Sequence, residues 1–253
     1  MRVCVLSSGS KGNSTYIETK NHKILVDIGT SSLYVENSLK SIGVDPRDID
    51  IVLITHSHVD HVNGLRVFSK KYKPLVYISE KILKESKLRI ENISSEEEIN
   101  IDSDIKIKSI PLSHDVADIK GYLIEEGNTS FVYITDTGYI NEKNYKYIKN
   151  KSIYVFESNH DVEMLMNNPK YPHQTKIRIL SDKGHLSNKD SAYYLSKLIG
   201  DNTRHVVLAH LSEQNNTEEL ALNTLKEALS KKSIEFKNID VARQNQISKV
   251  YNI

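Results

Sequence analysis

Residues 55–61, THSHVDH, concentrate side chains that bind metal ions. The motif holds four potential ligands, namely His56, His58, Asp60 and His61. Side chains of an extended chain alternate between its two faces, so we expect His56 and His58 to point the same way. Asp60 and His61 follow after the chain turns and can serve a neighbouring ion. A solvated charged loop is the alternative, but this density of ligands after a strongly apolar segment favours a metal site.

Two further candidate ligands end later apolar segments. His114 lies in IPLSHD and Asp136 in YITDTG. Taken alone, His114 could be a core or surface histidine, and Asp136 could simply form a turn. After the motif at 55–61, we expect both at a shared rim where strands end. Imidazole and carboxylate ligands without a thiolate suit Zn²⁺, Mn²⁺ or Fe²⁺, and ligand type alone does not choose among these metals.

Short β-prone runs alternate with helical patterns along the chain. We expect strands over 1–6, 15–20, 23–29, 48–57, 74–79, 105–115, 121–127, 130–138, 152–161, 204–212, 236–244 and 247–253. We expect helices over 31–43, 63–72, 142–150, 187–200 and 217–232, with Ser31 or Ser32 and Ser187 or Asn188 near two of their caps. This order predicts a layered α/β architecture with helices packed outside sheets. We find no low-complexity linker, so residues 1–253 are expected to form a single domain.

Composition narrows the class of protein. Lys+Arg 34 against Asp+Glu 33 leave a formal net charge of +1, so a polyanion would have to be held by a local patch. The single cysteine, Cys4, excludes an internal disulfide and fits a reducing compartment. No apolar run approaches the ~20 residues that spanning a membrane needs. We therefore expect a cytoplasmic protein that does not bind membranes.

Several motifs together carry a family resemblance. They are THSHVDH, SSGSKGNSTYI, ILVDIGTS, SIPLSHD, YITDTGYI, ESNHD, KGHLSN and LAHLSEQNN. THSHVDH followed by the later His114, Asp136 and His210 resembles the ordered motifs of the metallo-β-lactamase superfamily, and the remaining motifs together resemble its YycJ/WalJ subgroup of DNA exonucleases. The resemblance runs from residue 3 to about residue 222 and implies an αββα four-layer sandwich with a dinuclear metal site at one edge.

The resemblance also implies roles for individual residues. One ion would be held by His56, His58 and His114, a second by Asp60, His61 and His210, with Asp136 bridging both. Asp27 matches an acid that supports a metal ligand, as a metal-bound imidazole usually donates its other N–H to a carboxylate. Asp60 and His185 are the expected catalytic residues. His185 resembles a histidine that contacts phosphate and protonates the leaving oxygen in phosphodiesterases of the superfamily.

Substrate contacts are expected around these groups. The candidates are Ser10 and Asn13 in the glycine-containing loop 7–14, Lys183 and Asn188 beside His185, and His160 in ESNHD. The glycines of that loop could let backbone N–H groups converge on an anion, although a flexible hairpin turn explains it equally well. His160 could instead pair locally with Glu157 or Asp161. Lys176 and Arg178 could add positive charge near Lys183.

Two divalent ions, Zn or Mn with Fe possible, would activate a bridging hydroxide as nucleophile. The resemblance predicts a 5′-to-3′ exonuclease acting on duplex DNA ends. An RNA-processing nuclease is a close variant. A small-molecule thioester or lactone hydrolase could use the same ions, but has less need of a dedicated acid such as His185. A non-catalytic, metal-stabilised module would leave the surplus of ligands unexplained. The sequence leaves the oligomeric state open.

Overall fold

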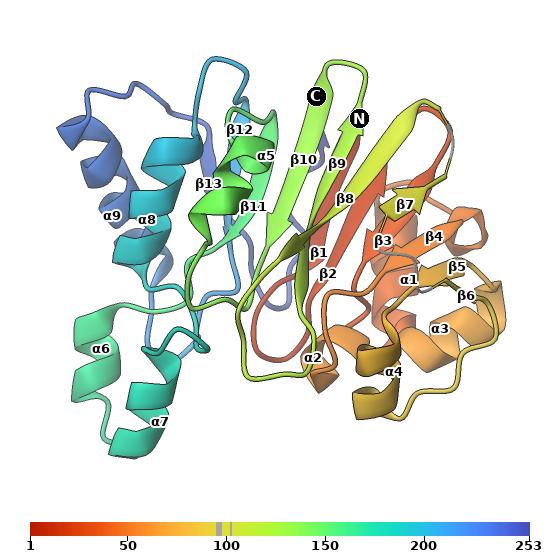
Figure 1. The fold of residues 1–253 in the computed structure, drawn as a ribbon, viewed down its shortest axis with the longest axis horizontal. Helices are drawn as coiled ribbons and strands as arrows, with labels where there is room; N and C mark the ends of the chain where they lie inside the picture. The colour runs from red at the N-terminus through yellow and green to blue at the C-terminus, as the bar shows by residue number, and fades with distance from the viewer. Residues whose placement is uncertain (95–97, 102) are drawn as a thin grey trace.

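The computed structural model describes residues 1–94, 98–101 and 103–253. Two seven-stranded sheets face each other, and helices cover the outer face of each (Figure 1). Val5 and Ile17 of one sheet share a buried cluster with Tyr122 and Phe131 of the other. Each fully buried side chain of this kind stabilises the fold by about 1.5–3 kcal/mol. The predicted αββα sandwich is therefore confirmed.

The first sheet comes mainly from the N-terminal half of the chain. Its order is β14 (Tyr251–Asn252), β1 (Arg2–Ser7), β2 (Ser14–Glu18), β3 (Lys23–Val26), β4 (Ile51–Leu53), β5 (Leu75–Tyr77) and β6 (Ile93–Ser94). From β3 to β6 the neighbours pair in parallel, whereas β1 pairs antiparallel with β2 and β14. The chain therefore leaves β3 and β4 at the same edge of the sheet.

The second sheet is built in the same mixed manner. Its order is β13 (Ile239–Val241), β12 (His205–Ala209), β11 (Ile153–Glu157), β10 (Thr129–Ile134), β9 (Lys120–Glu126), β8 (Ile105–Pro111) and β7 (Glu98–Asn100). Neighbours from β10 to β13 are parallel, and β9 runs antiparallel between β8 and β10. The carboxyl ends of β8, β10, β11 and β12 therefore meet at one edge.

Most of the helices lie on the outer faces of the sheets. They are α1 (Ser32–Ser41), α2 (Val59–Val62), α3 (Leu65–Tyr72), α4 (Glu80–Ser86), α5 (Tyr145–Ile148), α6 (Val162–Asn167), α7 (His173–Ile179), α8 (Asn188–Leu198) and α9 (Glu218–Lys231), with 3₁₀ turns at Pro46–Asp48 and Glu142–Asn144. The hydroxyl of Ser31 caps α1 and that of Ser187 caps α8. Among the described residues, no helix is long and apolar enough to cross a membrane.

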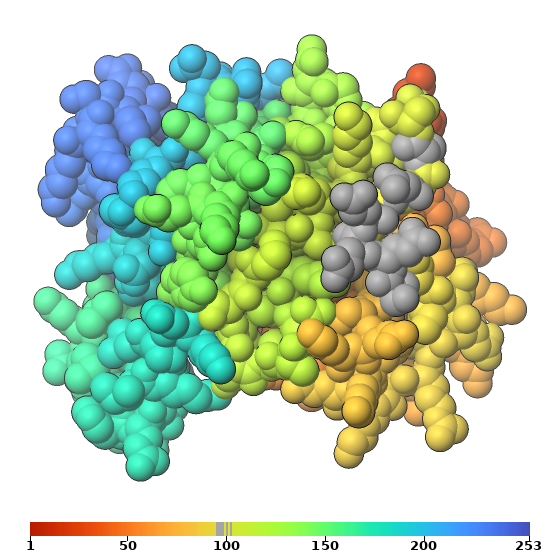
Figure 2. Space-filling model, in the orientation of Figure 1, coloured from red at the N-terminus to blue at the C-terminus, as the bar shows by residue number. Residues whose placement is uncertain are grey.

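Some elements differ from the sequence-based expectation. The polar stretch after residue 79 contains α4, β6 and β7, although residues 95–97 and 102 lie outside the described residues. Helices α6 and α7 were not predicted, because neither carries a continuous apolar face: α6 buries only Leu165, and α7 buries nothing. The segment of α6 and α7 forms the lower-left corner of the face in Figure 2.

Candidate metal centre and cleft

The loop after β4 delivers the ligands of the first sheet. His56 leaves the strand, and helix α2 begins at Val59 and turns Asp60 and His61 back toward it. The loop packs tightly on the chain after β3, because a Cβ on Gly29 would lie 1.7 Å from the Asp60 carbonyl oxygen. Asn13 N also donates to that oxygen at 2.8 Å. Backbone contacts therefore fix where α2 places its side chains.

Strained backbone marks the same edge of both sheets. Asp27, Asp136 and His210 adopt left-handed conformations, with φ of 59°, 58° and 55°. Each lies one or two residues beyond a strand, after β3, β10 and β12 respectively. Such a conformation costs roughly 1–2 kcal/mol for a residue with a side chain. Its recurrence at three strand exits is the pattern expected at a functional site.

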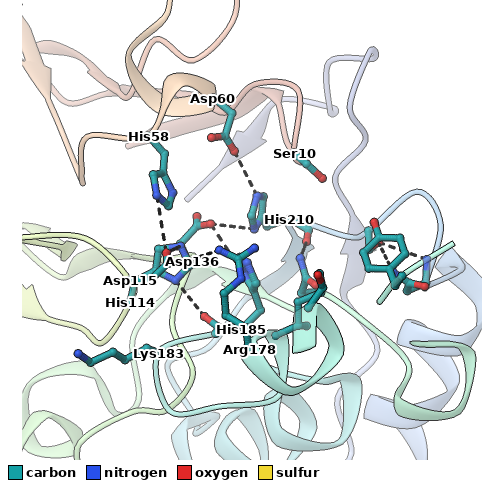
Figure 3. Close-up of a pocket in the computed structure, with 17 residues that line it drawn as sticks. Ser10, His58, Asp60, His114, Asp115, Asp136, Arg178, Lys183, His185 and His210 are labelled. Atoms are coloured by element: carbon teal, nitrogen blue, oxygen red, sulfur yellow. Dashed lines mark hydrogen bonds and ion pairs between the residues drawn. The ribbon is translucent and has the colours of Figure 1, made fainter. Parts of the chain in front are cut away.

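The structure brings the predicted ligands together in the two expected groups. His56, His58 and His114 each offer an atom within 4.8 Å of the others, and so do Asp60, His61 and His210. Asp136 joins the groups: it offers an atom within 4.8 Å of His56, and its Oδ2 and Oδ1 lie 3.1 Å from His61 Nε2 and 3.3 Å from His210 Nδ1. In Figure 3, His58 and Asp60 approach from one side, and His114 and Asp136 from the other.

Buried atoms without partners show that this cluster fits divalent ions. His56 Nε2, His210 Nε2 and Asp136 Oδ2 are buried and lack a hydrogen bond within the described residues. Such an atom costs free energy unless something binds it. Burial, reinforced by the neighbouring His61, holds the pKa of His56 well below its ordinary value, so the ring is neutral at pH 7. Neutral imidazole is the form that binds a metal.

Asp27 holds one of these histidines in place. Its Oδ2 lies 2.7 Å from His61 Nδ1, and the backbone N and hydroxyl of Thr55 donate to its two oxygens at 2.9 and 2.8 Å. In the neutral ring this hydrogen bond places the proton on Nδ1, so an ion would use the lone pair of His61 Nε2, which Asn13 Nδ2 approaches at 3.0 Å. His114 Nδ1 is held in the same way by the Gly184 carbonyl at 3.0 Å.

Glu157 is the functional residue that sequence reasoning missed. This fully buried carboxylate ends β11, and its Oε1 lies 2.7 Å from His185 Nδ1 and 3.2 Å from His210 Nδ1. Its Oε2 accepts hydrogen bonds from the backbone N of Thr137 and Leu186. Burial opposes ionisation, but His185 and His210 outweigh it and lower the pKa of Glu157 to about 2. The available signal was the position of this acid in the sequence. It directly follows YVF and so ends a strand, near the same rim that Asp136 reaches.

An open cleft of about 260 Å³ adjoins the cluster. His185 reaches it with 20% of its side chain exposed, and Ser10, Lys183, His58 and Asp60 also line it (Figure 3). Ser10 and Lys183, two of the predicted substrate contacts, both line this cleft.

Three other predicted substrate contacts, Asn13, Asn188 and His160, are buried and do not line this cleft. Asn13 is buried. Its side-chain amide accepts a hydrogen bond from Gly9 N and donates to the Gly9 carbonyl, and its Nδ2 lies 3.0 Å from His61 Nε2. Asn188 is buried in hydrogen bonds with Ser158 and Asn216.

His160 is also buried, and neither ring nitrogen has a hydrogen-bond partner among the described residues. It therefore neither faces the cleft nor forms the local pair considered as the alternative.

The loop 7–14 likewise does not present a cradle of free N–H groups. The backbone N of Gly9, Lys11, Gly12 and Asn13 all donate within the protein. The loop therefore supports the ligands of α2, with Ser10 as its residue in the cleft.

Comparison with known proteins agrees with this geometry. The family model for the metallo-beta-lactamase superfamily matches residues 8–143. The exodeoxyribonuclease YycJ of Bacillus anthracis is 40% identical over 235 residues, which cover 90% of this chain and 89% of that protein. The exodeoxyribonuclease WalJ of Streptococcus pneumoniae is 38% identical over 251 residues, covering 94% and 93%.

Solved structures share the fold. The metallo-beta-lactamase fold protein YhfI of Bacillus subtilis superposes with a TM-score of 0.70 at 15% identity, covering 98% of both chains. The short form of human tRNase Z gives 0.66 at 12% identity, covering 98% of this chain and 99% of that one. The matched motifs, the sandwich and the ligand cluster at its edge together show that this chain belongs to the metallo-β-lactamase superfamily.

Proposed function

We propose that this chain is a dinuclear metal-dependent exonuclease that removes nucleotides from the 5′ end of duplex DNA in the cytoplasm. The observation that carries the proposal is the setting of His185, which is held by a buried carboxylate, reaches the cleft and offers an atom within 4.8 Å of Asp136 and His210. The relatives at 38–40% identity, both named exodeoxyribonucleases, support a nucleic acid as substrate.

Metal binding falls to the two groups already described. His56, His58 and His114 would hold one ion, Asp60, His61 and His210 the other, and Asp136 would contact both. Zn²⁺ or Mn²⁺ suits these donors, with Fe²⁺ a further option. When bound, the ions would lower the pKa of a water molecule toward neutrality and offset the charge of the phosphate.

His185 would act as the general acid. Its Nδ1 is hydrogen-bonded to Glu157, so the proton for the leaving oxygen would be carried on Nε2. The buried anion of Glu157 would stabilise the protonated ring and keep its orientation. A phosphodiester needs such an acid because its alkoxide leaving group is poor, whereas a thioester needs it much less.

Asp60 would act at the other side of the cleft. It keeps 22% of its side chain exposed while its Oδ2 lies 3.7 Å from His210 Nε2. This position lets one carboxylate oxygen face the ligand group and the other accept a hydrogen bond from the attacking water. Asp60 would thereby orient the nucleophile opposite His185.

An oriented nuclease assay tests the proposal. The protein loaded with Mn²⁺ or Zn²⁺ is given duplex DNA labelled at either the 5′ or the 3′ end, with and without chelator. We expect early release of short 5′-labelled products, delayed loss of the 3′ label, and no reaction with chelator. Parallel reactions contain RNA, a thioester and a lactone. Brisk thioester or lactone hydrolysis without DNA cleavage would overturn the proposal, and preferential RNA cleavage would change its substrate.

A further inference from the structure

The cleft has two chemically different ends. Beside His58 and His114 lie the charged groups Asp115, Arg178 and Lys183. Beyond His210 the lining is neutral and polar, comprising Asn159, Ser212, Asn215 and Tyr171. Hydrogen bonds join most of that neutral end, since Asn159 Nδ2 donates to the His210 carbonyl and Ser212 N to the Asn159 carbonyl. The positive charge available to a substrate is therefore concentrated at one end.

Arg178 is held at the charged end by a single carboxylate. Its Nη1 donates to Asp115 Oδ2 at 2.6 Å, while Asp115 Oδ1 lies 3.3 Å from His114 Nε2 and 3.7 Å from His58 Nε2. Asp115 thus stands between Arg178 and the ligand histidines, as Figure 3 shows. Arg178 is 62% exposed, and its other N–H groups have no hydrogen-bond partner within the described part of the chain. They remain available to a ligand in the cleft.

Packing does not explain why α7 carries an arginine here. None of the residues of α7 is buried, so the helix adds little to the core. An exposed ion pair contributes about 0–1 kcal/mol to stability. The chain after α7 is nevertheless tightly placed, because a Cβ on Gly184 would lie 2.0 Å from the Ile179 carbonyl oxygen and His185 N donates to that same oxygen. Arg178 is therefore kept near the metal centre although stability does not require it.

The chemistry of guanidinium indicates what it binds. Arginine presents several N–H groups in a planar fork that matches the oxygens of a phosphate. A further cation beside a dinuclear metal centre is unfavourable unless an anion lies against that cation. Asp115 accepts a hydrogen bond from only one of the N–H donors of Arg178. Lys183, which forms no ion pair among the described residues, lines the same cleft. A second phosphate of a nucleic acid strand meets these requirements.

We propose that Arg178 binds the DNA phosphate adjacent to the scissile one, and that Asp115 is its positioning residue. The inference rests on the proposed nuclease function and adds the direction in which the strand lies. The strand continues over the Arg178 end, while the neutral end beyond His210 faces the opposite nucleoside. The scissile phosphate itself lies at the ligand cluster, within reach of His185.

The test compares a substrate that has many phosphates with a substrate that has only one. Arg178→Ala, Arg178→Lys and Asp115→Asn are assayed on duplex DNA and on bis(p-nitrophenyl) phosphate, a diester that has only the scissile group. Arg178→Ala should raise KM for DNA by about tenfold to a hundredfold, as expected for a lost charge-assisted hydrogen bond. Hydrolysis of the small diester should stay within twofold. The lysine variant should be intermediate, and Asp115→Asn should raise KM for DNA because Arg178 loses the carboxylate that positions it.

A binding measurement adds a readout independent of turnover. Fluorescence anisotropy with labelled duplex in chelator should show weaker binding by Arg178→Ala, and the slope of log K against log salt should fall by about one. Arg47→Ala is the matched control, because Arg47 forms an exposed pair with Asp45 outside the cleft. It should bind DNA like the wild type.

The outcomes separate the inference from the function on which it rests. If wild-type protein neither binds nor cleaves DNA, both fail. If the wild type cleaves DNA and Arg178→Ala keeps the same KM and salt slope, only the role of Arg178 is overturned. Equal losses on DNA and on the small diester would also overturn it, because Arg178 would then bind the scissile phosphate.

Discussion

The two sheets contribute to the metal centre in different ways. The first sheet supplies its ligands from one loop, where His56, His58, Asp60 and His61 follow β4. The second sheet supplies His114, Asp136 and His210 from beyond the ends of three separate strands. The first contribution depends on local sequence, whereas the second depends on topology, because parallel strands must bring distant residues to one edge.

Each sheet also provides a buried carboxylate that holds histidine. Asp27 contacts His61 alone among the site histidines, and both side chains are completely buried. Glu157 contacts His210, which is buried, and also His185, which reaches the cleft. In the proposed mechanism, such a carboxylate would support metal binding alone in the first sheet, and metal binding together with proton transfer in the second.

Removing Asp136 should have the largest effect, because it contacts ligands from both sheets. Asp136→Ala leaves His61 and His210 without their shared carboxylate. We expect both ions to be lost, and activity to fall by more than the roughly 10²–10⁴-fold assigned to a general acid. Elemental analysis and a duplex nuclease assay measure both effects. A variant that keeps two ions would show that the halves bind metal independently.

Replacing the two histidines that Glu157 holds should separate their roles. His185→Ala should keep both ions yet slow turnover by roughly 10²–10⁴-fold, the usual contribution of a positioned acid. His210→Ala should instead lose metal. Metal content and kcat are measured on both proteins. An empty metal site in His185→Ala would contradict this division of roles.

The supporting carboxylates should give smaller and distinguishable effects. Asp27→Asn and Glu157→Gln should each cost roughly 10–100-fold in metal affinity or activity. For Asp27→Asn, excess metal should restore most of the rate, because only His61 loses its partner. For Glu157→Gln, kcat should stay low at saturating metal, because His185 loses its anion. Identical metal rescue of both variants would remove the distinction between the two devices.

His160 should have the smallest effect, on stability rather than catalysis. Burial lowers its pKa to about 4, so the folded protein disfavours the charged form. The pKa is depressed relative to the unfolded chain, so stability is fully present above about pH 6.5 and is lost as pH falls toward 4. The loss should reach up to about 3 kcal/mol.

Urea unfolding in chelator at pH 7 and pH 4.5 measures the contribution of His160. His160→Leu should lose less stability between the two pH values than the wild type. Equal losses would show that His160 does not titrate in this range.

The difference between the two sheets explains which parts of the site could be predicted from the sequence. The ligands in THSHVDH could be predicted because they lie close together in the sequence, and Asp27 could be predicted from the family motif. Glu157 was missed because its position at a strand end was the one local signal, and the histidines that it contacts lie far along the chain. Asn13 and Asn188 lie in buried hydrogen-bond networks, a setting that the sequence does not distinguish from substrate contact for a polar residue near a motif. Helix α7 was missed because it has no buried face to impose a periodicity.

The number of metal ions per chain tests the central claim most directly. Purified protein loaded with Zn²⁺ or Mn²⁺ and then desalted is analysed by elemental mass spectrometry against protein concentration. We expect two ions per chain in the wild type, and about one each in His58→Ala, from the first group, and His61→Ala, from the second. A wild type that holds one ion or none at saturation would contradict the dinuclear centre and the mechanism built on it.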